Sequence, residues 1–263
     1  MKKALFITVR KDSSRLPGKT MRKILGIPVL GLIIKRAKQA KKFDDVIVCT
    51  TQRQIDDEVV AMAKIYGASI YRGPLEDKLE RWRGAAKSYA VDYIVTFDGD
   101  DLFCEPKLLD MGAEQIECRD LDFIEAPVGL ICGAFTYAFT AKSLEKVCQI
   151  KASEDTEMMW TYFKDTGLFK CGKLENVPEI FFSDKIRATL DYPEDMEFFT
   201  KIFEHFQCPE NNVGLDEIVI YLKDHPEVAA INIGRQQDFL VNQKARTHLE
   251  LKHYGTTICK EQG

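Results

Sequence analysis

The stretch Ala4-Leu5-Phe6-Ile7-Thr8-Val9, followed at once by Arg10-Lys11-Asp12-Ser13-Ser14-Arg15-Leu16-Pro17-Gly18-Lys19, decides the fold class. Its first six residues are mostly apolar and predict a buried strand. The next ten carry four cations, two hydroxyls and a Pro-Gly turn. Because open α/β sheets bind ligands beyond the carboxyl ends of their strands, and cationic turns suit phosphates, we predict an anion site in this loop.

Apolar runs of strand length alternate with helix-period segments through the rest of the first half. Strands are predicted at 46–50, 68–71 and 93–97, and helices at 26–40, 55–66 and 77–90. The second half predicts helices at 107–118, 141–150, 154–166 and 215–225, and extended segments at 134–139, 168–174 and 228–233. This alternation is typical of βαβ units around a mostly parallel sheet flanked by helices.

The domain organisation follows from what separates these segments. No Pro/Gly/Ser-rich linker, internal repeat or low-complexity tract divides the 263 residues. We therefore predict a single domain over 1–233 with an inserted or trailing lobe at about 122–185. The polar tail over 234–263 is expected to be mobile or used in association.

Composition excludes several classes of function. Lys plus Arg number 37 against 41 Asp plus Glu, a net charge of −4, so no overall field attracts nucleic acid or an anionic membrane. Apolar runs fall far short of the roughly 20 residues that span a bilayer. The eight cysteines form no C-x-x-C pair, which disfavours a structural zinc site. We expect reduced cysteines in a cytoplasmic protein, with neither nucleic acid nor membrane as partner.

Acidic residues follow the predicted strand at 93–97. Asp98-Gly99-Asp100-Asp101 comes directly after it, and Asp191 precedes Pro193, which predicts a helix start. By itself the Asp/Gly cluster is also typical of a solvated turn. Because Asp100 and Asp191 each follow a β-like run, we expect them to meet at one edge of the sheet. Two carboxylates together with substrate phosphates suit Mg²⁺.

The run Arg10-x-x-Ser13-Ser14-Arg15-Leu16-Pro17-Gly18-Lys19 resembles the signature of sugar cytidylyltransferases, the group of CMP-KDO and CMP-sialate synthetases. It is more similar still to their SpsF-like branch in spore coat polysaccharide biosynthesis. Similar segments at 71–81, 99–100, 190–195 and 225–232 extend the resemblance over roughly 3–233. The resemblance implies a Rossmann-like nucleotidyltransferase fold with a small acceptor/dimerisation lobe, and a homodimer. It also implies Mg²⁺ as cofactor, transfer from CTP to a sugar or sugar-acid-like acceptor, and release of pyrophosphate.

The same resemblance implies roles for individual residues. It implies nucleotide contacts from Arg10, Ser13, Ser14, Arg15, Gly18, Lys19, Arg72, Asp77 and Asp98, and metal ligands at Asp100 and Asp191. Arg15, Lys19 and Asp100 are the expected catalytic residues. As acceptor contacts we expect Tyr137, Glu157 and Trp160, together with Arg187, for which a surface ion pair is the alternative.

Two other functions compete with this hypothesis. Asp98-Gly99-Asp100 also satisfies the D-x-D pattern of a metal-dependent GT-A-type glycosyltransferase. A non-catalytic nucleotide-binding module is the third possibility, and the retention of Asp100 and Asp191 argues against it. The cationic turn ending at Lys19 favours a triphosphate over a nucleotide-sugar diphosphate. The acceptor, the base, and whether Asp98 is a metal ligand stay open.

Overall fold

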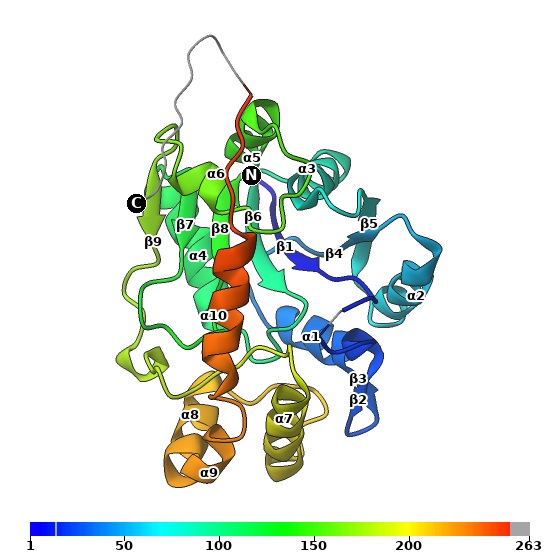
Figure 1. The fold of residues 1–263 in the computed structure, drawn as a ribbon, viewed down its shortest axis with the longest axis vertical. Helices are drawn as coiled ribbons and strands as arrows, with labels where there is room; N and C mark the ends of the chain where they lie inside the picture. The colour runs from blue at the N-terminus through cyan, green and yellow to red at the C-terminus, as the bar shows by residue number, and fades with distance from the viewer. Residues whose placement is uncertain (14, 253–263) are drawn as a thin grey trace.

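A seven-stranded sheet forms the centre of the computed structural model, which describes residues 1–13 and 15–252 (Figure 1). The strand order is β5-β4-β1-β6-β8-β7-β9. The strands β5 (Ser69–Gly73), β4 (Asp45–Thr51), β1 (Lys3–Thr8) and β6 (Tyr93–Asp98) run parallel to one another. The strand β1 therefore lies inside the sheet, as its mostly apolar sequence predicts.

The other half of the sheet comes from the segment at 122–185. β8 (Tyr137–Thr140) pairs antiparallel with β6, and β7 (Phe123–Glu125) pairs antiparallel with β8 and parallel with β9 (Cys171–Lys173). This segment thus continues the central sheet. A separate hairpin joins β2 (Lys23–Ile24) to β3 (Ile27–Pro28). The predicted α/β class with a mostly parallel sheet is confirmed.

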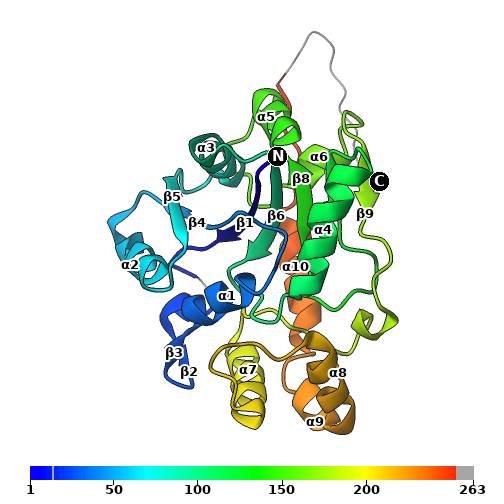
Figure 2. The same ribbon diagram turned by 180° about the vertical axis from the view of Figure 1, so that it is seen from behind.

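Helices cover both faces of the sheet because side chains along β1 alternate between two cores. Leu5 and Ile7 belong to one core, and Ala4 and Phe6 belong to the other. The first core includes residues of α1, α2 and α4, and the second includes residues of α3 and α5 (Figure 2). These helices are α1 (Val29–Ala37), α2 (Asp57–Ile65), α3 (Lys78–Tyr89), α4 (Pro106–Cys118) and α5 (Ala141–Ile150).

The carboxyl-terminal third adds helices at one end of the sheet and across one face. α7 and α8 add apolar residues to the core of α1 and α4, whereas α10 crosses in front of β6 and β8 (Figure 1). The helical elements of this third are η3 (Glu179–Phe181), α7 (Pro193–Phe206), α8 (Leu215–Asp224), α9 (Pro226–Ala229) and α10 (Arg235–Arg246). Three short helices lie earlier in the chain: η1 (Lys19–Met21), η2 (Gln54–Asp56) and α6 (Thr161–Lys164). Among the helices described here, none is both long and apolar enough to cross a membrane.

Two sequence-based predictions of secondary structure are wrong. The helix expected at 154–166 shrinks to α6, because the Thr156 hydroxyl donates to Asp77 (3.0 Å) and accepts from the N–H of Leu79 (3.0 Å), which ties this segment to the start of α3. The strand expected at 228–233 is replaced by α9, which begins at Pro226, a residue favoured in a first helical turn. The polar tail begins with the helix α10, and its mobility or use in association stays a prediction.

Candidate active site

The loop at residues 10–19, called here the basic loop, and the acidic cluster at 98–101 lie side by side because β1 and β6 are parallel neighbours. Thr8 and Asp98, the last residues of the two strands, stand opposite each other in the ladder. The N–H of Gly99 then donates to the carbonyl of Thr8 (3.0 Å). A Cβ at residue 99 would lie 2.6 Å from that oxygen, so glycine is needed for this close approach.

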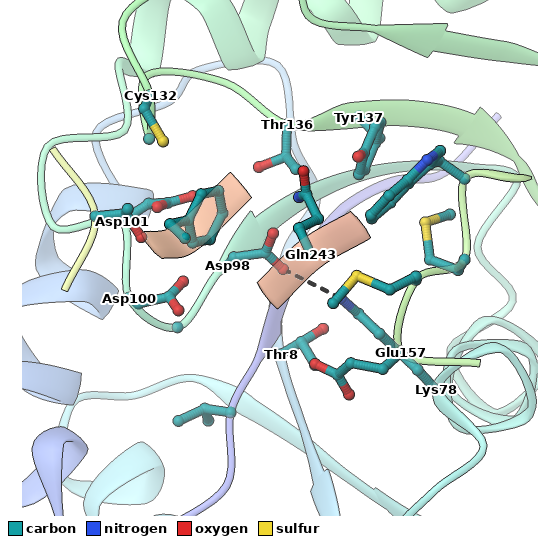
Figure 3. Close-up of a pocket in the computed structure, with 18 of the residues that line it drawn as sticks. Thr8, Lys78, Asp98, Asp100, Asp101, Cys132, Thr136, Tyr137, Glu157 and Gln243 are labelled. Carbon is teal, nitrogen blue, oxygen red and sulfur yellow. Dashed lines mark hydrogen bonds and ion pairs between the residues drawn. The ribbon is translucent and has the colours of Figure 1, made fainter. Parts of the chain in front are cut away.

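A cavity of about 400 Å³ opens at these carboxyl ends (Figure 3). This volume lies in the range of small-molecule sites. The basic loop and residues 98–101 form one part of its wall, and residues 130–137 and 157–160 form much of the rest. The inner face of α10 closes one side. The cavity therefore lies where open α/β sheets bind their ligands.

Lys19 joins three segments that are far apart in the sequence. Gly18 takes the left-handed conformation (φ 67°) that ends the Pro-Gly turn and starts η1 at Lys19. The Lys19 Nζ donates to Asp100 Oδ2 (2.9 Å), to Asp191 Oδ1 (3.2 Å) and to the carbonyl of Leu190 (2.7 Å). The structure thus brings Asp100 and Asp191 to one point, as expected, with a cation between them.

Asp191 is fully buried and is held by cations on several sides. Arg15 Nη2 lies 2.5 Å from its Oδ1, and Arg187 Nη2 lies 3.1 Å from its Oδ2. Burial by itself would raise the pKa of this carboxyl, but Lys19 and Arg15 outweigh burial and lower the pKa to about 2. Asp191 is therefore a permanent anion at neutral pH.

The pKa values of the carboxyls at the end of β6 are raised, in contrast to that of Asp191. Burial, reinforced by the charges of Asp191 and Asp98, raises the pKa of Asp100 despite the contact with Lys19. Burial and its neighbours Asp100 and Asp98 raise the pKa of Asp101 well above its ordinary value. Asp98 itself lies 3.5 Å from the Nζ of Lys78. This end of β6 carries more negative charge than the protein neutralises, which suits a bound cation.

The raised pKa of Asp101 leads us to predict how the Tm of a variant depends on pH. A buried carboxyl with a raised pKa binds its proton more tightly in the folded chain than in the unfolded chain. Ionisation of this carboxyl therefore lowers the stability of the folded chain as the pH rises above the unfolded pKa of about 3.9. We expect Asp101→Asn to raise the Tm at pH 7.5 by about 2–4 °C, corresponding to roughly 1 kcal/mol, and to leave the Tm nearly unchanged at pH 4. The measurement is thermal unfolding in chelator without nucleotide. A lower Tm at pH 7.5 would contradict the prediction.

Most residues singled out in the sequence line this cavity. They are Arg10, Ser13, Arg15, Lys19, Asp98, Asp100, Tyr137, Glu157 and Trp160. Gly18 shapes the turn without lining the cavity, and Ser14 lies outside the described residues. Asp191 stands behind Arg15 and Lys19, with no exposed surface.

Three predicted contacts point elsewhere. Arg72 donates to Asp57 (2.6 Å), away from the cavity. Asp77 caps α3 by accepting from the N–H of Glu80 (3.1 Å). Arg187 is fully buried and does not line the cavity, so the expected surface ion pair is wrong.

Arg187 instead belongs to a buried polar cluster below the cavity. Its Nε donates to Asp195 Oδ1 (3.1 Å), and Asp195 also accepts from the backbone N–H groups of Asp191 and Tyr192 (both 2.8 Å). These contacts fix the entry to α7 and with it the side chain of Asp191. The role visible in the structure is positioning.

The sequence reasoning missed two cations of α3 that line the cavity. Lys78 begins this helix, and its Nζ lies 4.8 Å from the centroid of the Trp82 ring. Arg81 follows one turn later and donates to the carbonyls of Pro74 (2.7 Å) and Leu75 (3.0 Å). Helical spacing provided a signal, because residues three apart share a helix face. The resemblance directed attention to Arg72 and Asp77 instead.

Comparison with known proteins agrees with this fold. The family model described as cytidylyltransferase matches residues 4–176. A protein of Methanocaldococcus jannaschii is 30% identical over 234 residues, covering 88% of this chain and 95% of that protein. The spore coat polysaccharide biosynthesis protein SpsF of Bacillus subtilis is 28% identical over 234 residues, covering 85% and 95%.

A solved structure is also similar. The cytidylyltransferase from Leptospira borgpetersenii serovar Hardjo-bovis superposes with a TM-score of 0.78 at 27% identity, covering 87% of this chain and 97% of that one. The chain belongs to the cytidylyltransferase family and is a nucleotidyltransferase. This membership favours nucleotidyl transfer over the glycosyltransferase and non-catalytic alternatives.

Proposed function

We propose that this protein transfers a cytidylyl group from CTP to a hydroxyl of a sugar or sugar-acid-like acceptor, with Mg²⁺ as cofactor. The observation that carries the proposal is the contact of Lys19 Nζ with both Asp100 and Asp191 at the wall of a cavity lined by a cationic loop. A cationic loop faces a triphosphate, and paired carboxylates face the divalent ion that accompanies it. Family membership and the similarity to SpsF support the substrate class.

The residues present fit a divalent cation. Lys19 Nζ lies within 3.2 Å of an oxygen of each carboxylate, so Asp100 and Asp191 already share one cation, and a metal ion could take its place when Lys19 turns to a substrate phosphate. The described residues contain no cluster of three or more His, Cys, Asp or Glu side chains arranged to hold a metal. Phosphate oxygens of the substrate would therefore complete the coordination, as is usual for Mg²⁺. When bound, the ion would offset charge on the α-phosphoryl group and on the leaving pyrophosphate.

The chain's own residues mainly position the reactants. Arg10, Arg15 and Lys19 would bind oxygens of the triphosphate. Asp100 would hold the metal at the cavity wall, and Asp191 would become its second ligand once Arg15 and Lys19 turn from Asp191 to the phosphates. The acceptor oxygen attacks the α-phosphorus, its proton is released, and the bond from that phosphorus to the β-phosphate oxygen breaks to give pyrophosphate. Transfer of this kind depends on alignment and charge stabilisation, and no protein nucleophile is needed.

The acceptor end of the cavity is formed by Tyr137, Trp160 and Glu157. The rings of Tyr137 and Trp160 stack with centroids 6.3 Å apart and offer an apolar surface. Burial would raise the pKa of Glu157, but the charges of Lys78 and Arg10 outweigh burial and lower it. An ionised Glu157 accepts hydrogen bonds from acceptor hydroxyls. The homodimer, and the role of 122–185 as an acceptor lobe, stay predictions.

Replacing Lys19 tests the triphosphate assignment. We expect Lys19→Ala to weaken CTP binding and to lower kcat/KM by about tenfold to a hundredfold each, the loss typical of one charge-assisted hydrogen bond. The measurements are calorimetric titration with CTP and a pyrophosphate-release assay. Lys23→Ala is the matched control, because Lys23 is an exposed lysine outside the cavity. Equal CTP affinity in the two variants would refute the assignment.

A further inference from the structure

One face of α10 forms part of the cavity wall. Phe239, Asn242, Gln243 and Arg246 all line the cavity, and their spacing of three, four and seven residues places them on one side of the helix. Gln237, on the same helix, is exposed and lies outside the lining. The inner face of α10 is therefore a structural part of the site.

α10 is held against the protein by polar contacts. It has no fully buried residue. Its first turn is fixed by the pair of Arg235 with Glu194 (2.6 Å) and by Gln236, which accepts from Arg187 Nη1 (3.0 Å). The Arg187 guanidinium also lies 4.8 Å from the ring centroid of Phe239. Substitutions along α10 can thus change the cavity wall without opening a hydrophobic core.

Gln243 enters the cavity from this helix. Figure 3 shows its side chain projecting from α10 on the side where Thr136 and Tyr137 lie. Within the described part of the chain, its side-chain amide makes no hydrogen bond. An amide offers two donors and one acceptor oxygen, which suits the hydroxyl groups of a polyol. Tyr137 provides the neighbouring apolar surface, and Glu157 provides an anionic acceptor of hydrogen bonds.

We propose that α10 is an acceptor-selecting wall, in which Gln243 hydrogen-bonds a hydroxyl of the bound acceptor. The inference rests on the proposed function for the assignment of the basic loop to the nucleotide. α10 lies beyond residues 4–176, which the family model matches, so the selecting residue and the nucleotide-binding loop come from separate parts of the chain. It follows that changes at Gln243 alter the affinity for the acceptor and leave the affinity for CTP unchanged.

The test compares Gln243→Ala with Gln237→Ala, a matched change on the outer face of the same helix. Alanine favours helix, so both variants keep α10. The probes are 3-deoxy-manno-octulosonate, N-acetylneuraminate, glucose and glucose 6-phosphate. Their binding is followed by ligand-observed NMR in the presence of CMP, which requires no turnover. CTP affinity is measured by calorimetry, and pyrophosphate release is assayed separately.

We expect at least one probe to bind the wild-type chain, and to bind Gln243→Ala roughly three- to tenfold more weakly, the range for one uncharged hydrogen bond. Gln237→Ala should bind it like the wild type, and all three proteins should bind CTP equally. Failure of every probe to bind, or equal binding by Gln243→Ala, would overturn the inference. Absent CTP binding or absent pyrophosphate release would count against the proposed function instead.

Discussion

Asp100→Asn should remove most of the turnover, lowering kcat by roughly a hundredfold or more, because a bound divalent ion contributes several kcal/mol of transition-state stabilisation. The amide keeps the shape of Asp100 but loses the charge that faces Lys19 (2.9 Å) and would face the metal. The pyrophosphate-release assay with CTP and Mg²⁺ measures this directly. We expect the KM for CTP to stay within about threefold, since Arg15 and Lys19 still bind the phosphates.

A control variant and a titration with Mg²⁺ test whether the loss of turnover arises at the metal site. Asp184→Asn removes an exposed carboxylate outside the cavity and should leave turnover unchanged. A higher concentration of Mg²⁺ should restore part of the activity of Asp100→Asn if the loss arises from weaker metal binding. Wild-type turnover in Asp100→Asn would exclude Asp100 as a metal ligand.

Arg187→Leu should lower the free energy of unfolding by about 3–5 kcal/mol, because it leaves buried carboxylates without their cation. Arg187, Asp191 and Asp195 have no exposed side-chain surface, and the guanidinium contacts both carboxylates at 3.1 Å. Equilibrium unfolding in urea measures the loss. The exposed Lys185→Leu should change stability by no more than about 0.5 kcal/mol.

The same variant separates a positioning role from acceptor binding. If Arg187 fixes Asp191 through the buried cluster, Arg187→Lys should recover part of the stability and most of the acceptor affinity. If the Arg187→Leu protein has wild-type stability but a raised KM for the acceptor, Arg187 binds the acceptor and does not position Asp191.

Much of the site follows from local patterns in the sequence. The apolar run 4–7 predicts an internal strand, and the parallel pairing of β1 with β6 places the loop that ends at Lys19 beside Asp100. The sequence predicts that Asp191 lies near Lys19 and Asp100 because it is expected to follow a strand. In the structure Asp191 follows an irregular segment and not a strand of the sheet, so the position is right but the reason is wrong. Its position depends on Arg187 and the start of α7, which no local pattern reveals.

The rest depends on long-range contacts. The sequence around Thr156 has a helical apolar stripe. The Thr156 hydroxyl nevertheless donates to Asp77 and accepts from the N–H of Leu79 at the start of α3, which holds the segment out of a helix. α10 has a polar sequence typical of a mobile tail, and it is placed by contacts such as Arg235 with Glu194. Local propensity cannot predict pairs that are separated by tens of residues.

A thermal-shift comparison of CTP, ATP, GTP and UTP, each with and without Mg²⁺, tests the central claim most directly. A ligand at 100 times its Kd stabilises the folded state by about 2.7 kcal/mol, which corresponds to roughly 5–10 °C in Tm for a chain of this size. We predict this shift for CTP with Mg²⁺, and much smaller shifts for the other nucleotides and for CTP in chelator. Equal shifts with all four nucleotides, or no shift with CTP, would contradict the account.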